Sequence, residues 1–109
     1  MFDYTIRCQL VGSPSSATYA SLKAKMAAFG ASDHLSGSDG YLYEMPYGEY
    51  RLVSAWSQQE VHRRAAAAVA GVGGGAVVVS SVTARYFSGL KRIASNVAAA
   101  LTAATFRRG

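Results

Sequence analysis

The chain opens with a segment in which apolar and polar residues alternate. The apolar positions are Phe2, Tyr4, Ile6, Cys8 and Leu10, and the polar positions between them are Asp3, Thr5, Arg7 and Gln9. Successive side chains of a strand point to opposite faces of a sheet. The alternation therefore predicts a strand with one buried face and one polar face.

Two later segments have the apolar spacing of a helix. The first carries Tyr19, Leu22, Met26 and Phe29, and Gly30 follows as a stop signal. The second opens with Ser57 and, three residues later, Glu60, which together form a capping box. This second helix is predicted to end near Ala70, at the glycine-rich run 71–75.

A β-hairpin is predicted between the two helices. Its first strand is expected over residues 32–37, and its second strand follows an Asp39-Gly40 pair. That pair favours a type I′ turn, in which both central residues have a positive φ. Pro46 should interrupt the second strand before the chain becomes extended again over residues 49–55.

The C-terminal part predicts one more strand and one more helix. Residues 76–85 are rich in β-branched side chains and predict the strand. An apolar stripe then predicts an amphipathic helix over residues 88–106, and its members are Leu90, Ile93, Val97 and Leu101.

This order of elements predicts an α+β fold of the ferredoxin-like β-α-β-β-α-β type over residues 1–90. Such a fold has one four-stranded antiparallel sheet with both helices on one face. The other face carries the polar side of the first strand. However, Val77, Val78 and Val79 put apolar groups on both faces of the last strand, so something is expected to cover part of that face. We expect the amphipathic helix over residues 88–106 to pack there or on a second subunit, and we expect a homodimer formed through the sheet or through this helix.

The composition fits one domain and points to an acidic partner. The 109 residues carry a net charge of +5. Residues 1–59 hold four basic and five acidic side chains, whereas residues 60–109 hold seven basic side chains and one acidic side chain. This asymmetry indicates a polyanion or an acidic protein as partner, although a basic tail that serves solubility would give the same pattern.

The expected cellular location and the expected lack of a disulfide are based on signals that the sequence does not contain. Cys8 is the single cysteine, so neither a disulfide nor a thiolate metal site is predicted. The first residues lack the basic and apolar pattern of a signal peptide, and the apolar run 65–79 is too short to span a bilayer. We therefore expect a cytoplasmic protein without membrane contact.

Few residues suggest catalysis. Cleavage of RNA without a metal needs a general base, a general acid and a cation. His34, His62 and Lys23 are the candidates, and surface polarity is the alternative role for each. Asp33 is not expected to pair with His34, because neighbours on a strand face opposite ways. The carboxylates are dispersed and no zinc-ligand spacing occurs, so no metal and no cofactor are predicted.

Basic and aromatic side chains provide candidates for nucleic-acid contact. The candidates for phosphate contact are Arg7, Lys23, Lys25, Arg63 and Arg64. Tyrosines 41, 43, 47 and 50 cluster on the hairpin, where they could stack on single-stranded bases or fill a core or a dimer interface.

Several of these features resemble a known family. The segment Leu10-Val11-Gly12, the helical positions Tyr19, Leu22 and Met26, and the segment from Tyr86 to Leu90 each match in part. The most specific match is the hairpin motif formed by Ser38, Asp39, Gly40, Tyr43, Met45, Pro46, Glu49 and Tyr50. Over residues 1 to about 90 the chain resembles the small bacterial family that contains the GhoS antitoxin of type V toxin–antitoxin systems.

The resemblance implies a ferredoxin-like fold and a small RNA-directed protein. It implies either an antitoxin-type endoribonuclease that cuts single-stranded RNA or a relative that binds RNA without cutting it. Nuclease relatives of similar shape carry an acid at the end of the first strand, where this chain has Leu10-Val11-Gly12. The alternative is therefore a non-catalytic regulator or inhibitor module that binds a protein and is encoded on a mobile element.

Overall fold

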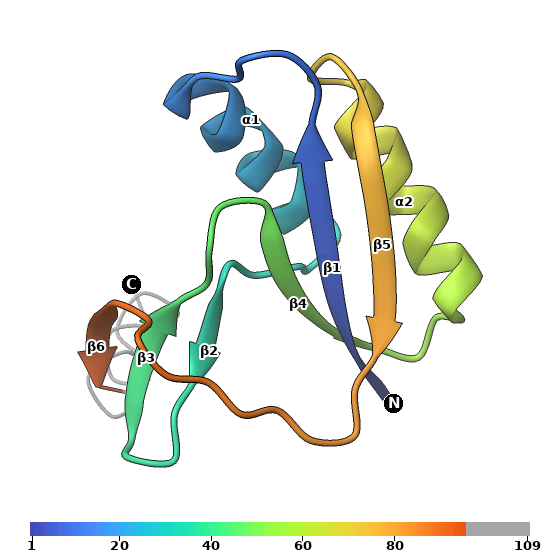
Figure 1. Ribbon diagram of the computed structural model, residues 1–109. Helices are drawn as coiled ribbons and strands as arrows, with labels where there is room; N and C mark the ends of the chain where they lie inside the picture. Colours follow the sequence, from blue (N-terminus) through green and yellow to red (C-terminus); the bar gives the residue numbers. More distant parts are fainter. Residues whose placement is uncertain (96–109) are drawn as a thin grey trace, which may run out of the picture.

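The computed structural model describes residues 1–95, which form an α+β fold with two helices and two three-stranded antiparallel sheets (Figure 1). The main sheet has the strand order β4-β1-β5. Its strands are β1 (Phe2–Leu10), β4 (Glu49–Ser54) and β5 (Gly75–Ser81). The longest strand, β1, lies in the centre, so it pairs along both edges.

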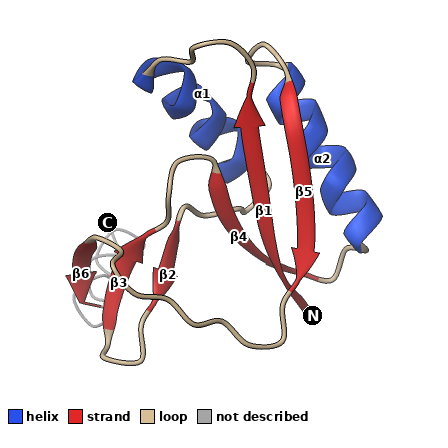
Figure 2. Ribbon diagram, viewed as in Figure 1, coloured by secondary structure: helices blue, strands red, loops and turns tan. Residues whose placement is uncertain are grey.

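Both helices lie on one face of the main sheet (Figure 2). They are α1 (Ser16–Ala27) and α2 (Gln58–Ala70). Ser15 and Ser57 cap them, because each hydroxyl accepts a hydrogen bond from the backbone N–H three residues on. Glu60 does not complete the predicted capping box with its side chain, since its carboxylate binds Arg63 and Arg64 instead.

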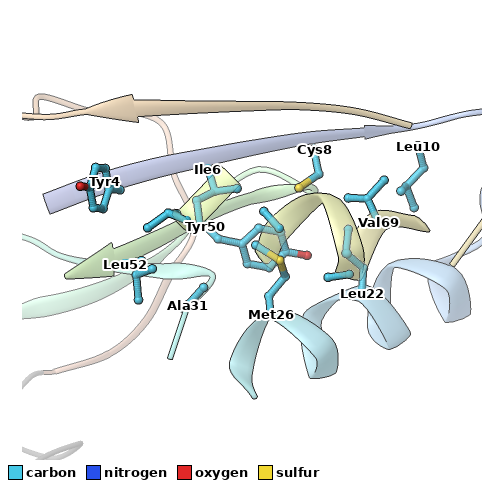
Figure 3. Close-up of a cluster of buried hydrophobic side chains, with 13 residues drawn as sticks. Tyr4, Ile6, Cys8, Leu10, Leu22, Met26, Ala31, Tyr50, Leu52 and Val69 are labelled. Carbon is cyan, nitrogen blue, oxygen red and sulfur yellow. The ribbon is translucent and has the colours of Figure 1, made fainter. Parts of the chain in front are cut away.

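The core lies between the main sheet and the two helices (Figure 3). The apolar positions of β1 from Tyr4 onward are all buried there, as the alternation predicted. They pack against Leu22 and Met26 of α1 and against Val61 of α2, each fully buried. Cys8 is part of this core, and burial raises the pKa of its thiol to about 11.

The second sheet is built from shorter strands. It has the order β2-β3-β6, with β2 (His34–Ser36), β3 (Tyr41–Glu44) and β6 (Arg92–Ser95). The hairpin of β2 and β3 was predicted, but its turn is not of type I′. Gly40 has a φ of 83°, whereas Asp39 does not have a positive φ.

The expected four-stranded sheet is wrong. The segment expected to be its outer strand pairs with β4 at a single bridge, where Ser32 and Arg51 exchange two backbone hydrogen bonds of 2.7 and 2.9 Å. The chain then turns away at Asp33, and β2 pairs with β3 instead of following β4. The hairpin therefore starts a separate sheet.

The expected helix over residues 88–106 also differs. Residues 92–95 form β6, which pairs with β3 across an irregularity between Leu42 and Tyr43. The helix was predicted from the spacing of apolar residues alone. Backbone pairing with the edge of β3 determines the conformation of residues 92–95 instead, because tertiary pairing overrides such a short apolar pattern. Residues 88–91, the start of the predicted helix, form a loop, and the part from residue 96 onward lies outside the described residues. The strand predicted over residues 76–85 ends at Ser81.

Candidate nucleic-acid interface

The face of the main sheet opposite the helices carries polar and charged side chains, and we call it the open face. On β1 it displays the odd-numbered residues Asp3, Thr5, Arg7 and Gln9. Arg51 of β4 stands beside Thr5, and Glu49 stands beside Arg7. Ser80 and Val78 of β5 flank the same two positions from the other side. The sequence predicted this polar face of β1, and the register adds the neighbours.

Asp3 joins two arginines on the open face. Arg51 donates to its carboxylate at 3.1 Å, and Arg85 donates to it at 3.3 Å. Burial alone would raise the pKa of Asp3, but these guanidinium groups outweigh burial and hold that pKa below its usual value. Arg85 also donates to the Thr5 hydroxyl at 2.6 Å. The segment that leads from β5 to β6 is thereby attached to the open face (Figure 1).

Asp33 connects two of the predicted catalytic candidates. The Lys23 ammonium lies 3.1 Å from one carboxylate oxygen, and His34 Nδ1 lies 3.2 Å from the other. Burial acts to raise the pKa of Asp33, but hydrogen bonds from Lys23 and His34 outweigh it, so the pKa of Asp33 is lowered. The expectation that Asp33 and His34 would not pair is wrong, because Asp33 sits in the bend before β2 where strand alternation does not apply.

His34 and Arg51 line the same hollow. This hollow has a volume of about 340 Å³, and its other lining residues include Ser32, Ser36 and Val53. The His34 side chain is 43% exposed, and the Arg51 side chain is 37% exposed. Since Asp33 accepts from Nδ1, the neutral imidazole carries its proton there and leaves Nε2 as an acceptor. A base and a cation therefore line one hollow at the junction of the two sheets.

Lys23 lies on the other side of Asp33, in a cleft of about 190 Å³. Tyr19 and Tyr47 stack along this cleft, with ring centroids 5.4 Å apart and an angle of 20° between the planes. Tyr47 is 77% exposed, so the outer face of the stacked pair is open to an incoming ring. Tyr50 also lines the cleft but is buried, and burial raises its pKa to about 12. Tyr50 therefore stays neutral near neutral pH.

The remaining phosphate candidates do not gather at this place. Arg7 is on the open face and lies 3.6 Å from Glu49. Arg63 and Arg64 both pair with Glu60 on α2, at 2.6 and 3.0 Å, on the side of the molecule away from the open face. Arg64 also lies over the Trp56 ring, 3.8 Å from its centroid. The methylene next to the Lys25 ammonium lies near Gly71, at the end of α2.

His62 is separated from His34. It lies on α2 and lines another hollow, together with Gln59, Arg63 and Ala66. The structure therefore brings His34 and Lys23 together through Asp33 and leaves His62 apart. A catalytic pair of the two histidines is not formed.

The family-like hairpin motif has mainly structural roles. Asp39 accepts a hydrogen bond from the Tyr43 hydroxyl and another, at 3.1 Å, from the Tyr41 backbone N–H. Ser38 and Gly40 complete this turn. Pro46 lines the cleft that holds Lys23, and Glu49 and Tyr50 begin β4.

Sequence reasoning missed Asp33, Arg51 and Arg85 as members of the site. Arg51 sits at a polar position inside a strand, and nothing in the sequence indicates that this position lines the same hollow as His34. Arg85 reaches Asp3 across 82 positions of sequence, so no local pattern could link them. The alternation rule separates Asp33 from His34, although the bend before β2 lets their side chains meet.

The comparisons with known proteins add no relative. No family model, curated protein or solved structure matches this chain. Over residues 1–95, no three or more His, Cys, Asp or Glu side chains come together as a metal-binding group. None of the helices in that part of the chain is both long and apolar enough to cross a membrane.

Proposed function

We propose that this chain is a GhoS-like RNA-directed protein that binds single-stranded RNA across the junction of its two sheets and cleaves it without a metal. The observation that carries the proposal is the placement of Asp33. It orients the imidazole of His34 into the hollow that Arg51 lines, and it holds Lys23 in the cleft on its other side.

The strand order supports the GhoS-like part of the proposal. In a ferredoxin-like sheet the first strand lies between the third and the fourth, and the second strand lies outside the third. Here β1 lies between β4 and β5, and the bridge at Ser32 stands outside β4. We interpret the main sheet as a ferredoxin-like sheet whose outer strand is reduced to that bridge.

RNA binding is proposed to use stacking and phosphate contacts together. A base stacks on Tyr47, which is backed by Tyr19, and such stacking tolerates any sequence because every base has a π-face. Arg51 and Arg7 contact phosphates along the open face, and Lys23 contacts one at the cleft. Tyr47 shares the cleft with Lys23, and Arg51 shares the hollow with His34. Since Asp33 binds both Lys23 and His34, the RNA is proposed to pass over Asp33.

Cleavage is proposed to follow acid–base chemistry in the hollow. His34 Nε2 takes the proton of a ribose 2′-hydroxyl, and the 2′-oxygen attacks the adjacent phosphorus. Arg51 stabilises the negative charge that develops on the phosphoryl oxygens. The bond from phosphorus to the 5′-oxygen breaks, and that oxygen takes a proton from water. The products are a 2′,3′-cyclic phosphate end and a 5′-hydroxyl end, and His34 returns its proton to solvent.

The test is an assay of labelled single-stranded RNA at low and physiological salt, with and without a chelator. We expect a salt-sensitive complex and cleavage that survives the chelator. His34→Ala should abolish cleavage and leave binding in place, whereas the matched control His62→Ala should change neither. RNA with a single 2′-deoxy nucleotide should resist cleavage at that position.

Other outcomes would redirect the proposal in defined ways. Binding without cleavage in the unaltered chain would make it a non-cleaving RNA-binding relative. Cleavage that the chelator abolishes would contradict the role of His34 as the base. Neither binding nor cleavage would overturn the proposal and favour the protein-binding regulator module.

A further inference from the structure

We infer that the outer edge of β5 pairs with the same edge of a second copy of this chain. Among residues 1–95, β5 is an edge strand of the main sheet, because β1 pairs with one of its sides and no strand pairs with the other. β5 is seven residues long. An edge strand presents a row of donors and acceptors that another strand can pair with.

The hydrogen bonds between β1 and β5 show which backbone groups of β5 point away from β1. Val82 donates its N–H to the Asp3 carbonyl at 2.8 Å, and Val11 donates to the Gly74 carbonyl at 3.2 Å. Hydrogen-bonded pairs alternate along an antiparallel ladder, so the even-numbered residues of β5 bond to β1. The outward groups therefore belong to Gly75, Val77, Val79 and Ser81. The Gln58 side-chain amide agrees with this, because it donates to the Val79 carbonyl from outside at 2.7 Å. This exposed hydrogen bond has to break before a second strand pairs there.

These outward groups can pair with the same groups of a second copy around one two-fold axis. When two β5 strands run antiparallel with the axis at Val78, Val77 meets Val79 of the second copy, and Gly75 meets Ser81 of the second copy. Each outward residue then has an outward partner, and Val78 meets Val78 of the second copy as a non-hydrogen-bonded pair. A second copy fits for this reason, since a C2 interface uses the same patch on both subunits.

The composition of β5 also favours self-pairing. Edge strands are usually protected by charged residues, proline or bulges. β5 reads Gly-Ala-Val-Val-Val-Ser-Ser and has none of these, and its pairing with β1 is regular over its whole length. Val78 is 55% exposed on the open face, so two copies would cover apolar surface at the axis, and no charged residue of β5 would face its own copy.

The paired sheet would join the two open faces. Arg7 lies directly beside Val78 in the neighbouring strand, so the Arg7 side chains of both copies would flank the axis. The contact is one strand wide, and small interfaces of this kind are weak. The dimer should therefore depend on protein concentration.

The test is a pair of single-cysteine additions on the full chain. Val78→Cys places two thiols in a non-hydrogen-bonded pair, where the Cα atoms lie about 4.5 Å apart and a disulfide can form. Ser80→Cys is the matched control on the same strand and face. In the paired strands, the two thiols of Ser80→Cys would be offset by four residues, roughly 13 Å along the strand, which is too far for a disulfide. The native Cys8 is buried and does not interfere.

We expect Val78→Cys to form a covalent dimer under mild oxidation and Ser80→Cys to remain monomeric. In the unaltered chain, sedimentation should show mass rising with concentration, and Val78→Lys should abolish the rise. Hydrogen exchange should slow at the Val77 and Val79 amides as the dimer forms. A monomer at every concentration, or equal cross-linking of the two cysteine variants, would overturn the inference.

Discussion

Gly48 holds the most constrained backbone position of the candidate site. Its φ is 81°, and a Cβ placed there would overlap the Cys8 carbonyl oxygen. The Gly48 carbonyl accepts a hydrogen bond from the Cys8 N–H at 2.7 Å. The turn that carries Tyr47 is therefore pressed against β1, and this fixes the wall of the cleft that contains Lys23.

Substitution of Gly48 by alanine should be more costly than the same change at Gly12. Gly12 also has a positive φ, of 76°, but no atom lies within 4 Å of the place that a Cβ would take. Gly12→Ala should lose about 1–2 kcal/mol of unfolding free energy from backbone strain alone. Gly48→Ala should lose a further ~1–3 kcal/mol, because the backbone must move to relieve the overlap. Urea unfolding of both variants measures this, and equal losses would contradict the close approach to Cys8.

Sequence reasoning at the residue scale succeeds where the signal is local. The interruption at Pro46 and the cap at Ser57 depend on nearby residues, and both are present. The pair of Asp33 and His34 was missed because the strand was expected from residue 32, whereas β2 begins at His34 and leaves Asp33 in the bend before it.

The two sheets differ in how they are anchored at the scale of elements. The main sheet shares one buried cluster with both helices, and Leu22 of α1 is fully buried in it. Leu35 of β2 is also buried, at 5% exposed, but it lies outside that cluster. Within residues 1–95, the second sheet therefore takes little part in the buried cluster shared with the helices, and we expect it to open more readily.

Truncation of one leucine in each region should separate the two behaviours. Leu22→Ala should lower the global unfolding free energy by about 2–5 kcal/mol, because it leaves a cavity in the shared core. Leu35→Ala should mainly speed hydrogen exchange in β2 and β3, with a smaller loss of global stability. Exchange rates and urea unfolding, measured on both variants, check this. A uniform rise in exchange along the whole chain in Leu35→Ala would show that the sheets unfold together.

Helices and strands could be predicted from the sequence where their hydrophobic pattern extends over many residues. β1 and α2 follow from nine and thirteen residues of clear period. β6 has four residues, and its conformation depends on the β3 edge, which lies about fifty positions earlier in the chain. Its apolar spacing alone favoured a helix, so the pairing partner decided the outcome.

At the scale of the whole molecule, internal carboxylates partly neutralise the basic surfaces. Asp3 neutralises part of the positive charge of Arg51 and Arg85 on the open face, and Glu60 does the same for Arg63 and Arg64 on α2. The charge asymmetry along the sequence did not reveal this, because Asp3 and Arg85 lie in opposite halves of the chain. A binding partner therefore meets the charge of one face of the molecule, not the charge of one half of the sequence.

Removal of one carboxylate from each face should distinguish local charge from net charge. Asp3→Asn and Glu60→Gln each remove one negative charge and so raise the net charge by one. If RNA binds the open face, Asp3→Asn should raise the affinity a few-fold at low salt and steepen the salt dependence by about 0.7 for each additional phosphate that the protein neutralises. Glu60→Gln should change binding little. Gel shifts over a salt series measure this, with thermal unfolding as a check that both variants are folded. A similar rise in affinity for both would assign the effect to net charge alone.

The burial of the single cysteine has a practical consequence. Cys8 lies at 4% exposure beneath α1 and α2, and its raised pKa keeps the thiol protonated near neutral pH. A thiol-specific reagent can therefore modify the native chain only after the helices move away from β1. The rate of that modification, followed by mass spectrometry, would act as an intrinsic clock for the opening of the core, without a label or an engineered probe.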